Sequence, residues 1–281
     1  MGRKPLVVTD FLAQHGRMPR VGDDIPPWHY RGWLGFYVQE IQRMHPAVPD
    51  RWGYLYETIA RGRFLDQPIP KVQFTARSAE PEKNIEDLVK IASSDGAWTA
   101  FSRLVDFMCY GLGVSEAVPD LSDEVSEALY RKLDVGPWLL HPWDYLGEYL
   151  SITKAHGFNP NAFYPTPHPV VEAMVSMAMA DVRDARNKSV CDPCMGTGRM
   201  LLHASNYSMF LFGQDIDEFV LKIAKINGAL YAPWMICPPP KHLMSQKIAP
   251  PIPTQGGHRV RRSPRPAPPL PPRPPKRSSS E

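Results

Sequence analysis

The chain has 281 residues, of which 43% are hydrophobic, so it can form a buried core in one large domain or two ordinary ones and is not wholly disordered. Its formal charge of +3 is unevenly distributed, because residues 241–281 carry a net +8 and leave −5 for residues 1–240. Net charge therefore gives no support for nucleic-acid binding by residues 1–240, although a local basic groove could still bind nucleic acid.

The four cysteines are irregularly spaced, and residues 1–10 do not form a secretory leader. This pattern argues against a disulfide framework and predicts a reducing, cytoplasmic location. No stretch approaches the roughly 18 apolar residues of a membrane span, so we expect no role in a membrane.

The front half of the chain is predicted to be mostly helical, because its apolar residues recur at helical spacing. One of the predicted helices begins with Ser122 as its N-cap and has an acidic first turn. The predicted helices are 33–45, 52–62, two within 81–114 that break near 94–96, 121–133, and 141–157.

The pattern changes near residue 160, where short apolar strands alternate with helices. A helix is predicted to begin with Thr166 as its N-cap and Pro167 at its first position. The elements that follow are a strand at 189–192, a helix at 198–206, a strand at 209–215 and a helix at 217–231. This alternation predicts a parallel sheet and the opening of a doubly wound α/β domain.

The last part of the chain is rich in Pro, Ser and Arg and has few periodic apolar residues. Such a composition predicts a disordered tail with polyproline II character. The string RPAPPLPPR (265–273) has the spacing of a ligand for proline-binding grooves, but any Pro and Arg mixture produces such matches by chance. The expected organisation is a helical region over 1–158, an α/β region over 159–236 and the tail over 237–281.

The stretch CDPCMGTGRM (191–200) combines a Cys-x-x-Cys pair with a Gly-x-Gly pair. A structural zinc site needs four ligands, and the other cysteines offer no second pair, so we expect no metal. A redox pair would lie at the start of a helix, whereas this helix is predicted to begin only after Gly198. Two readings remain open, a plain tight turn and a loop that lets the backbone approach a ligand beyond the ends of parallel strands.

The next predicted strand supports the ligand-binding interpretation. It ends with Asp215, which lies 23 residues after Asp192 and thus near the spacing of about 20 residues at which an acidic group meets ribose hydroxyls. Nicotinamide cofactors would use a similar arrangement, but their fingerprint requires a third glycine where this chain has Leu201.

Three segments together resemble a known family. DPCMGTGRML is similar to a motif of S-adenosylmethionine-dependent DNA adenine N6-methyltransferases, above all the modification subunits of type I restriction systems and their phage relatives. FYPTPHPVVEAM (163–174) and GQDIDEFVLKIAKINGALY (213–231) resemble the segments that flank this motif in the family. The resemblance implies a Rossmann-like class I methyltransferase fold, S-adenosylmethionine as cofactor and DNA as substrate, with a specificity or partner subunit as a further partner.

The resemblance also implies roles for individual residues. Those at the methionine end of the cofactor would be Phe163, Tyr164, Thr166 and Pro167. The loop around its amino acid and sulfonium would be formed by Asp192, Cys194, Gly196 and Gly198. Asp215 would bind the ribose, and Ile216 would pack on the adenine face. An acidic Asp192 suits the cationic sulfonium and ammonium groups.

The family transfers the methyl group with an Asn-Pro-Pro-aromatic motif, and this sequence contains none. The nearest string, CPPP (237–240), has a thiol where an amide is needed and a proline where an aromatic ring is needed. We therefore assign no catalytic residue and expect a truncated or frame-shifted family member, in which methyl transfer by this chain alone is doubtful. The alternative is a non-catalytic remnant or partner subunit that binds S-adenosylmethionine or nucleic acid.

Overall fold

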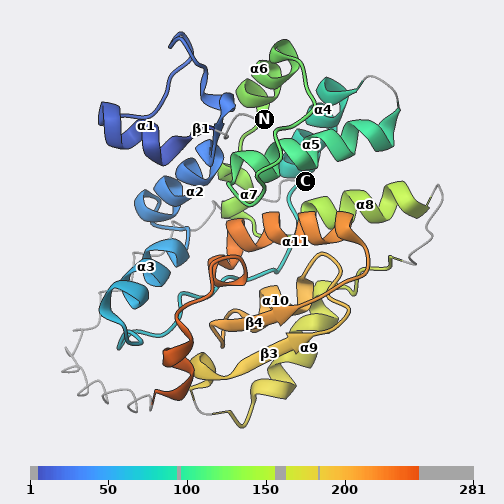
Figure 1. Cartoon of the computed structure of the whole chain (residues 1–281). Coiled ribbons are helices and arrows are strands. Elements are labelled where there is room, and N and C mark those ends of the chain that lie inside the picture. The colour runs from blue at the N-terminus through green and yellow to red at the C-terminus, as the bar shows by residue number, and fades with distance from the viewer. Residues whose placement is uncertain (1–5, 94–95, 156–162, 183, 247–281) are drawn as a thin grey trace, which may run out of the picture. The chain divides into compact units, whose positions relative to one another are not determined.

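The computed structural model describes residues 6–93, 96–155, 163–182 and 184–246 (Figure 1). The chain divides into two units, Met1–Ala249 and Pro250–Glu281, and all described residues belong to the first. Within the described ranges, no helix is long and apolar enough to cross a membrane.

The front half is mostly helical, as the apolar spacing predicts. It also contains a short parallel pair of strands, β1 (Leu6–Val7) and β2 (Tyr30–Arg31), which the sequence does not signal. Ser122 caps its helix as expected, since its side chain accepts a hydrogen bond from the backbone N–H of Val125. The helices are α1 (Val8–His15), α2 (Trp33–Met44), α3 (Arg51–Arg61), α4 (Ala79–Ala92), α5 (Ala97–Gly111), α6 (Asp123–Lys132), α7 (Gly136–Leu140) and α8 (Tyr145–Ala155).

The second part is an α/β arrangement around a parallel pair of strands, β3 (Ser189–Asp192) and β4 (Phe210–Gly213). In the register of this pair, Ser189 lies opposite Phe210 and Asp192 opposite Gly213, so the two strands end together. The helices of this part are α9 (His168–Met179), α10 (Arg199–Ala204) and α11 (Glu218–Tyr231). The predicted alternation and the parallel pairing are confirmed, and the described part of this sheet has two strands.

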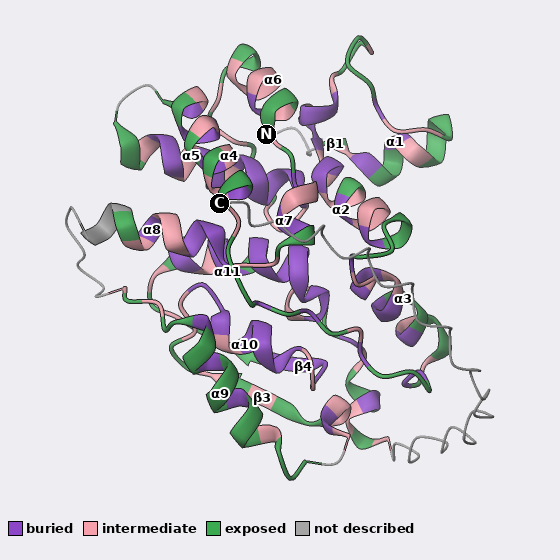
Figure 2. Cartoon of the chain, turned by 180° about the vertical axis from the view of Figure 1, so that it is seen from behind, coloured by how far each residue is buried: buried purple, intermediate pink, exposed green. Residues whose placement is uncertain are grey.

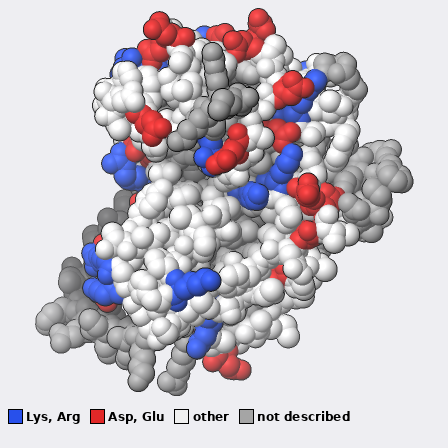
Figure 3. All heavy atoms as spheres, in the orientation of Figure 1, with Lys and Arg blue, Asp and Glu red and all other residues white. Residues whose placement is uncertain are grey.

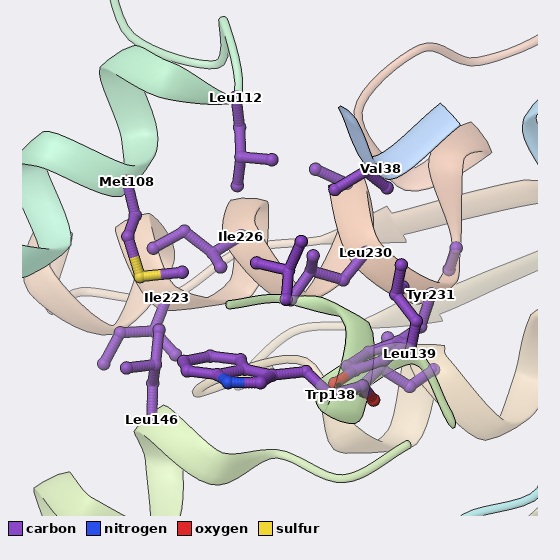
Figure 4. Packing of buried hydrophobic residues seen from close by; sticks show 14 of the residues in the cluster. Val38, Met108, Leu112, Trp138, Leu139, Leu146, Ile223, Ile226, Leu230 and Tyr231 are labelled. Carbon is purple, nitrogen blue, oxygen red and sulfur yellow. Dashed lines mark hydrogen bonds between the residues drawn. The ribbon is translucent and has the colours of Figure 1, made fainter. Parts of the chain in front are cut away.

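Helix α11 connects the two parts through one hydrophobic core (Figure 4). Ile223, Ile226 and Leu230 on this helix pack with Met108 of α5 and Trp138 of α7. Burial of each such apolar side chain stabilises the folded state by about 1.5–3 kcal/mol. Figure 2 shows buried residues along α11, α5 and α10, while much of β3 and α9 is exposed. The helical region and the α/β region therefore fold around a shared core.

The start of α9 differs from the prediction. Pro167 rather than Thr166 is the N-cap, and Pro169 provides the proline of the first turn, where no N–H is needed. The backbone carbonyl of Thr166 accepts a hydrogen bond from the Nη1 of Arg199. Because a residue before a proline disfavours the helical conformation, Thr166 stays outside the helix, which begins one residue later than predicted.

Two further boundaries are corrected. The helix predicted over 141–157 begins at Tyr145, since the Asp144 carboxylate accepts the N–H of Gly147 at the start of α8, and residues 156–157 lie outside the described residues. The predicted tail begins too early, because residues 241–245 form a short 3₁₀ helix whose Leu243 is fully buried. Residues 247–281, including RPAPPLPPR, lie outside the described residues.

A buried arginine joins helix α3 to the end of α10. The Nη2 of Arg51 donates to the backbone carbonyl of Ser205 at 2.5 Å and to its hydroxyl at 2.9 Å, and the guanidinium lies over the ring of Trp234 at 4.1 Å. Full burial lowers the pKa of Arg51 through desolvation. The planar guanidinium can form the hydrogen bonds and the stacking contact at the same time, which an ammonium group cannot.

We therefore expect Arg51→Lys to lower the free energy of unfolding by about 1–3 kcal/mol, because the charge stays buried while hydrogen bonds and stacking are lost. Arg43→Lys on α2 is the matched control, since Arg43 is 65% exposed and pairs with Glu40 on the surface. It should change stability by less than about 0.5 kcal/mol. Urea denaturation measures both values, and equal effects would contradict this role of Arg51.

Candidate functional site

A cavity of about 680 Å³ lies where β3 and β4 end together. Open α/β sheets bind ligands at this position, beyond the carboxyl ends of the strands. Eight of the ten residues that the sequence assigns to a cofactor site line this cavity. They are Phe163, Tyr164, Thr166, Asp192, Cys194, Gly196, Asp215 and Ile216. The structure thus brings together residues from three separate segments of the chain.

The other two assigned residues do not line the cavity. Pro167 borders an adjoining hollow of about 400 Å³ together with Trp143 and Glu148. Gly198 has a φ of 89° and is the N-cap of α10. A Cβ at Gly198 would lie 3.1 Å from the methyl carbon of Met235, so this glycine permits the turn and the close packing of the loop on its far side.

The carboxylates of the site hold the glycine-rich loop in place. Asp215 accepts the backbone N–H of Gly196 at 2.9 Å through Oδ2 and that of Asp217 at 3.0 Å through Oδ1. Asp192 accepts the N–H of Cys194 at 3.1 Å through Oδ1. Because each carboxylate oxygen has two lone pairs, these bonds leave acceptor capacity for hydroxyl or ammonium groups of a ligand.

A third carboxylate, which the sequence motifs did not indicate, also binds this loop. Asp144 is fully buried, and its Oδ2 accepts from the hydroxyl of Thr197 at 2.5 Å and from the Nε of Arg199 at 2.7 Å. Its Oδ1 accepts from the Nδ2 of Asn227 at 2.8 Å and from the N–H of Gly147 at 2.9 Å. The buried Asn227 within the otherwise apolar rows of α11 was the sequence signal for this cluster.

Arg199 lines the cavity, but its guanidinium is engaged by the protein. Besides Asp144, it donates to Glu148 at 2.8 Å and to the Thr166 carbonyl at 3.1 Å. Its positive charge is therefore balanced by carboxylates of the helical region. Three further carboxylates line the cavity, those of Asp192, Asp215 and Asp217, so the cavity favours a cationic ligand.

Two buried histidines lie behind the cavity, His168 at the start of α9 and His203 on α10. The N–H of Asp144 donates to the Nε2 of His168 at 3.4 Å, so His168 carries its proton on Nδ1 and donates it to the Nε2 of His203 at 2.9 Å. This arrangement requires both rings to be neutral. Desolvation and the nearby charge of Arg199 lower the pKa of His168 to about 3 and that of His203 to about 4.

The cysteines do not form a metal site in the described part of the chain. No group of three or more His, Cys, Asp or Glu side chains there is placed to hold a metal ion. Cys191 and Cys194 are both exposed and free, and only Cys194 lines the cavity. The Cys-x-x-Cys spacing thus results from the strand end and the loop that follows it.

The structure is that of an α/β protein with a cavity at the carboxyl ends of its parallel strands. Residues 148–232 match the family model of the N-6 DNA Methylase family. The three sequence motifs, at 163–174, 192–201 and 213–231, all lie within this segment.

Comparisons with solved structures and with curated proteins give weaker evidence on the family. A solved structure of the methyltransferase subunit of a type I restriction-modification system from Streptococcus thermophilus is 22% identical, and the alignment covers 71% of this chain. The chain spans only 48% of that structure, and the TM-score of 0.30 is too low to support an argument. No curated protein matched the sequence.

The histidine pair predicts a pH dependence of stability. In the unfolded chain both histidines protonate near a pKa of about 6.5, whereas in the folded chain they stay neutral down to about pH 4. The unfolded state therefore binds more protons between these values. We expect the free energy of unfolding to fall by about 2 kcal/mol per histidine as the pH drops from 7 to 5.

Urea denaturation at pH 7, 6 and 5 measures this dependence. His203→Gln, which keeps a hydrogen-bond acceptor for His168, should remove about half of the effect of pH. His141→Gln is the control, because His141 is exposed. Equal stability of the unmodified chain at pH 7 and pH 5 would contradict the neutral pair.

Proposed function

We propose that residues 163–217 bind S-adenosylmethionine and that the protein takes part in the transfer of its methyl group to the N6 of adenine in DNA. The observation that carries this proposal is the cavity where β3 and β4 end, with the glycine-rich loop held between Asp192 and Asp215. The match of residues 148–232 to the N-6 DNA Methylase family model supports the same reaction.

The charge of the cavity supports this ligand. S-adenosylmethionine carries a sulfonium and an ammonium group, and the carboxylates of Asp192, Asp215 and Asp217 line the cavity. We place Asp192 beside these cationic groups and Asp215 on the ribose hydroxyls, where a carboxylate can accept both hydrogen bonds. Cys194 and Gly196 would border the same part of the cofactor, while Gly198 would shape the loop from behind.

The apolar lining supports an adenine site. Ile216 is 87% exposed and Tyr164 is 81% exposed, so both present apolar surface that a bound purine ring would cover. We assign Ile216 to the adenine face, in keeping with its place directly after Asp215. Phe163, Tyr164 and Thr166 would border the methionine end, and Pro167 would support them from the adjoining hollow.

Methyl transfer needs groups that this sequence does not contain. The adenine must leave the duplex, and its amine must meet acceptors near the methyl group, at an unpairing cost of a few kcal/mol. Because the Asn-Pro-Pro-aromatic motif is missing from residues 1–281, we propose that this chain supplies cofactor binding and that a partner subunit or segment supplies the acceptors.

The second candidate is a non-catalytic protein that binds S-adenosylmethionine or nucleic acid. On the described part of the face drawn in Figure 3, basic and acidic side chains are interspersed and form no broad basic surface. The net charge of +8 over residues 241–281 makes this segment suitable for contact with DNA phosphates in either case. The free cysteines fit a reducing, cytoplasmic location.

Cofactor binding is tested with labelled S-adenosylmethionine in equilibrium dialysis. We expect saturable binding, and Asp215→Ala should weaken it at least tenfold, because the ribose contact and the support of the loop are both lost. Asp181→Ala is the matched control, since Asp181 is exposed and does not line the cavity. An affinity of Asp215→Ala equal to that of the unmodified chain would refute the ribose assignment.

Adding DNA to the same preparation tests whether the chain transfers the methyl group alone. Label transferred to adenine-containing DNA by the chain alone would show that it is an autonomous methyltransferase and would overturn the need for a partner. Binding without transfer would support the division of functions proposed above. Absence of binding would refute the cofactor site.

Thiol labelling locates the bound cofactor independently. Saturating S-adenosylmethionine should slow the alkylation of Cys194, which lines the cavity, and leave that of Cys191 unchanged, which is exposed outside it. Peptide mass spectrometry follows both residues in one sample. Equal protection of both cysteines, or of neither, would place the cofactor elsewhere.

A further inference from the structure

Asp144 lies outside both the segment that the sequence analysis assigned to the cofactor region and the segment that matches the family model, 148–232. Its carboxylate nevertheless accepts three hydrogen bonds from outside its own helix and one from within it. Of the four groups that donate to its carboxylate, Thr197 and Arg199 belong to the loop and the first residue of α10, and Asn227 belongs to α11.

The position of these donors fixes the backbone of the loop. Thr197 is the middle residue of Gly196-Thr197-Gly198, and its hydroxyl is bound by Asp144 while its carbonyl accepts from Asn227 at 3.0 Å. Both glycines that flank Thr197 have a positive φ, 52° and 89°, in which they have access to many alternative conformations. Because Thr197 is anchored at both its side chain and its carbonyl, the two flanking glycines cannot adopt these alternative conformations.

The loop is thus held from two sides. Asp215 binds the N–H of Gly196 from the end of β4, and Asp144 binds the side chain of Thr197 from the start of α8. Asp215 lies on the cavity, whereas Asp144 does not line it. The contribution of Asp144 is therefore made through the loop and not through contact with a ligand.

We infer that Asp144 is the positioning residue of the glycine-rich loop, and that the helical region before the family segment is required to keep the cofactor site in its binding conformation. This inference rests on the proposed function, because it assigns to Asp144 the preorganisation of the S-adenosylmethionine site. A preorganised loop binds with higher affinity, because its ordering cost is met during folding and not on binding.

Thr197→Val tests the inference with little change of shape, because a methyl group replaces the hydroxyl that donates to Asp144. We expect the dissociation constant for S-adenosylmethionine to rise at least tenfold. Thr197→Ser retains the hydroxyl and should restore most of the affinity. Asp106→Asn is the control, because Asp106 joins α5 to α11 through a surface ion pair with Lys222 at 2.6 Å and should have no effect on binding.

Hydrogen exchange provides a measurement that does not depend on the cofactor. Without ligand, the peptide covering 193–200 should exchange faster in Thr197→Val and Asp144→Asn than in the unmodified chain, while a peptide from α5 should be unchanged. Faster exchange throughout the molecule would indicate general destabilisation and overturn the inference. Thr197→Val keeps the test valid if Asp144→Asn does not fold, because it removes only one of the four donors.

The two proposals fail in different ways. If the unmodified chain does not bind S-adenosylmethionine, the proposed function is refuted, and the exchange of peptide 193–200 still decides whether Asp144 holds the loop. If the unmodified chain binds and Thr197→Val has the same affinity and the same loop exchange, the role of Asp144 is refuted while the cofactor site stands.

Discussion

A carboxylate removed from water is stable only when hydrogen-bond donors replace the lost water, and Asp144 meets four of them in a fully buried position. These donors come from α8, α11, the loop before α10 and the first residue of α10, so the charge is satisfied only when these elements are in place. Arg199 supplies the compensating charge and extends the cluster to Glu148 and to the carbonyl of Thr166. One buried interaction thus determines how the helical region, the glycine-rich loop and the entry to α9 are arranged.

The elements that surround the cavity are too short to be stable alone. Strands β3 and β4 have four residues each and α10 has six, whereas isolated helices below about 12 residues and isolated strand pairs are marginal in water. Helix α10 is held at its start by Asp144 and just beyond its end by Arg51, and both of these residues belong to the helical region. The helical region therefore supports the cavity, since it supplies contacts that fix the position of the loop.

The parts of the site that depend on local pattern could be predicted from the sequence. The four-residue strand that ends at Asp192 is followed by turn residues, and the two glycines mark this backbone turn. The parts that depend on distant contacts could not be predicted. The partners of Asp144 are 3 to 83 residues away, and nothing in the Trp-Asp dipeptide indicates them. The capping of α9 was predicted wrongly for the same reason, because Arg199, 33 residues later, binds the carbonyl of the expected cap residue. The hydrogen bond between His168 and His203 could not be predicted either, because the two residues are 35 positions apart.

The cavity, its three carboxylates and the match of residues 148–232 to the N-6 DNA Methylase family model support the proposal that the chain holds S-adenosylmethionine where its parallel strands end. The most direct test of this account is an amide NMR titration of the full chain with S-adenosylmethionine. The account predicts saturable shifts centred on Asp192, Gly196 and Ile216, with the resonances of α4 unchanged. Shifts confined to other parts of the molecule, or none at saturating cofactor, would contradict it.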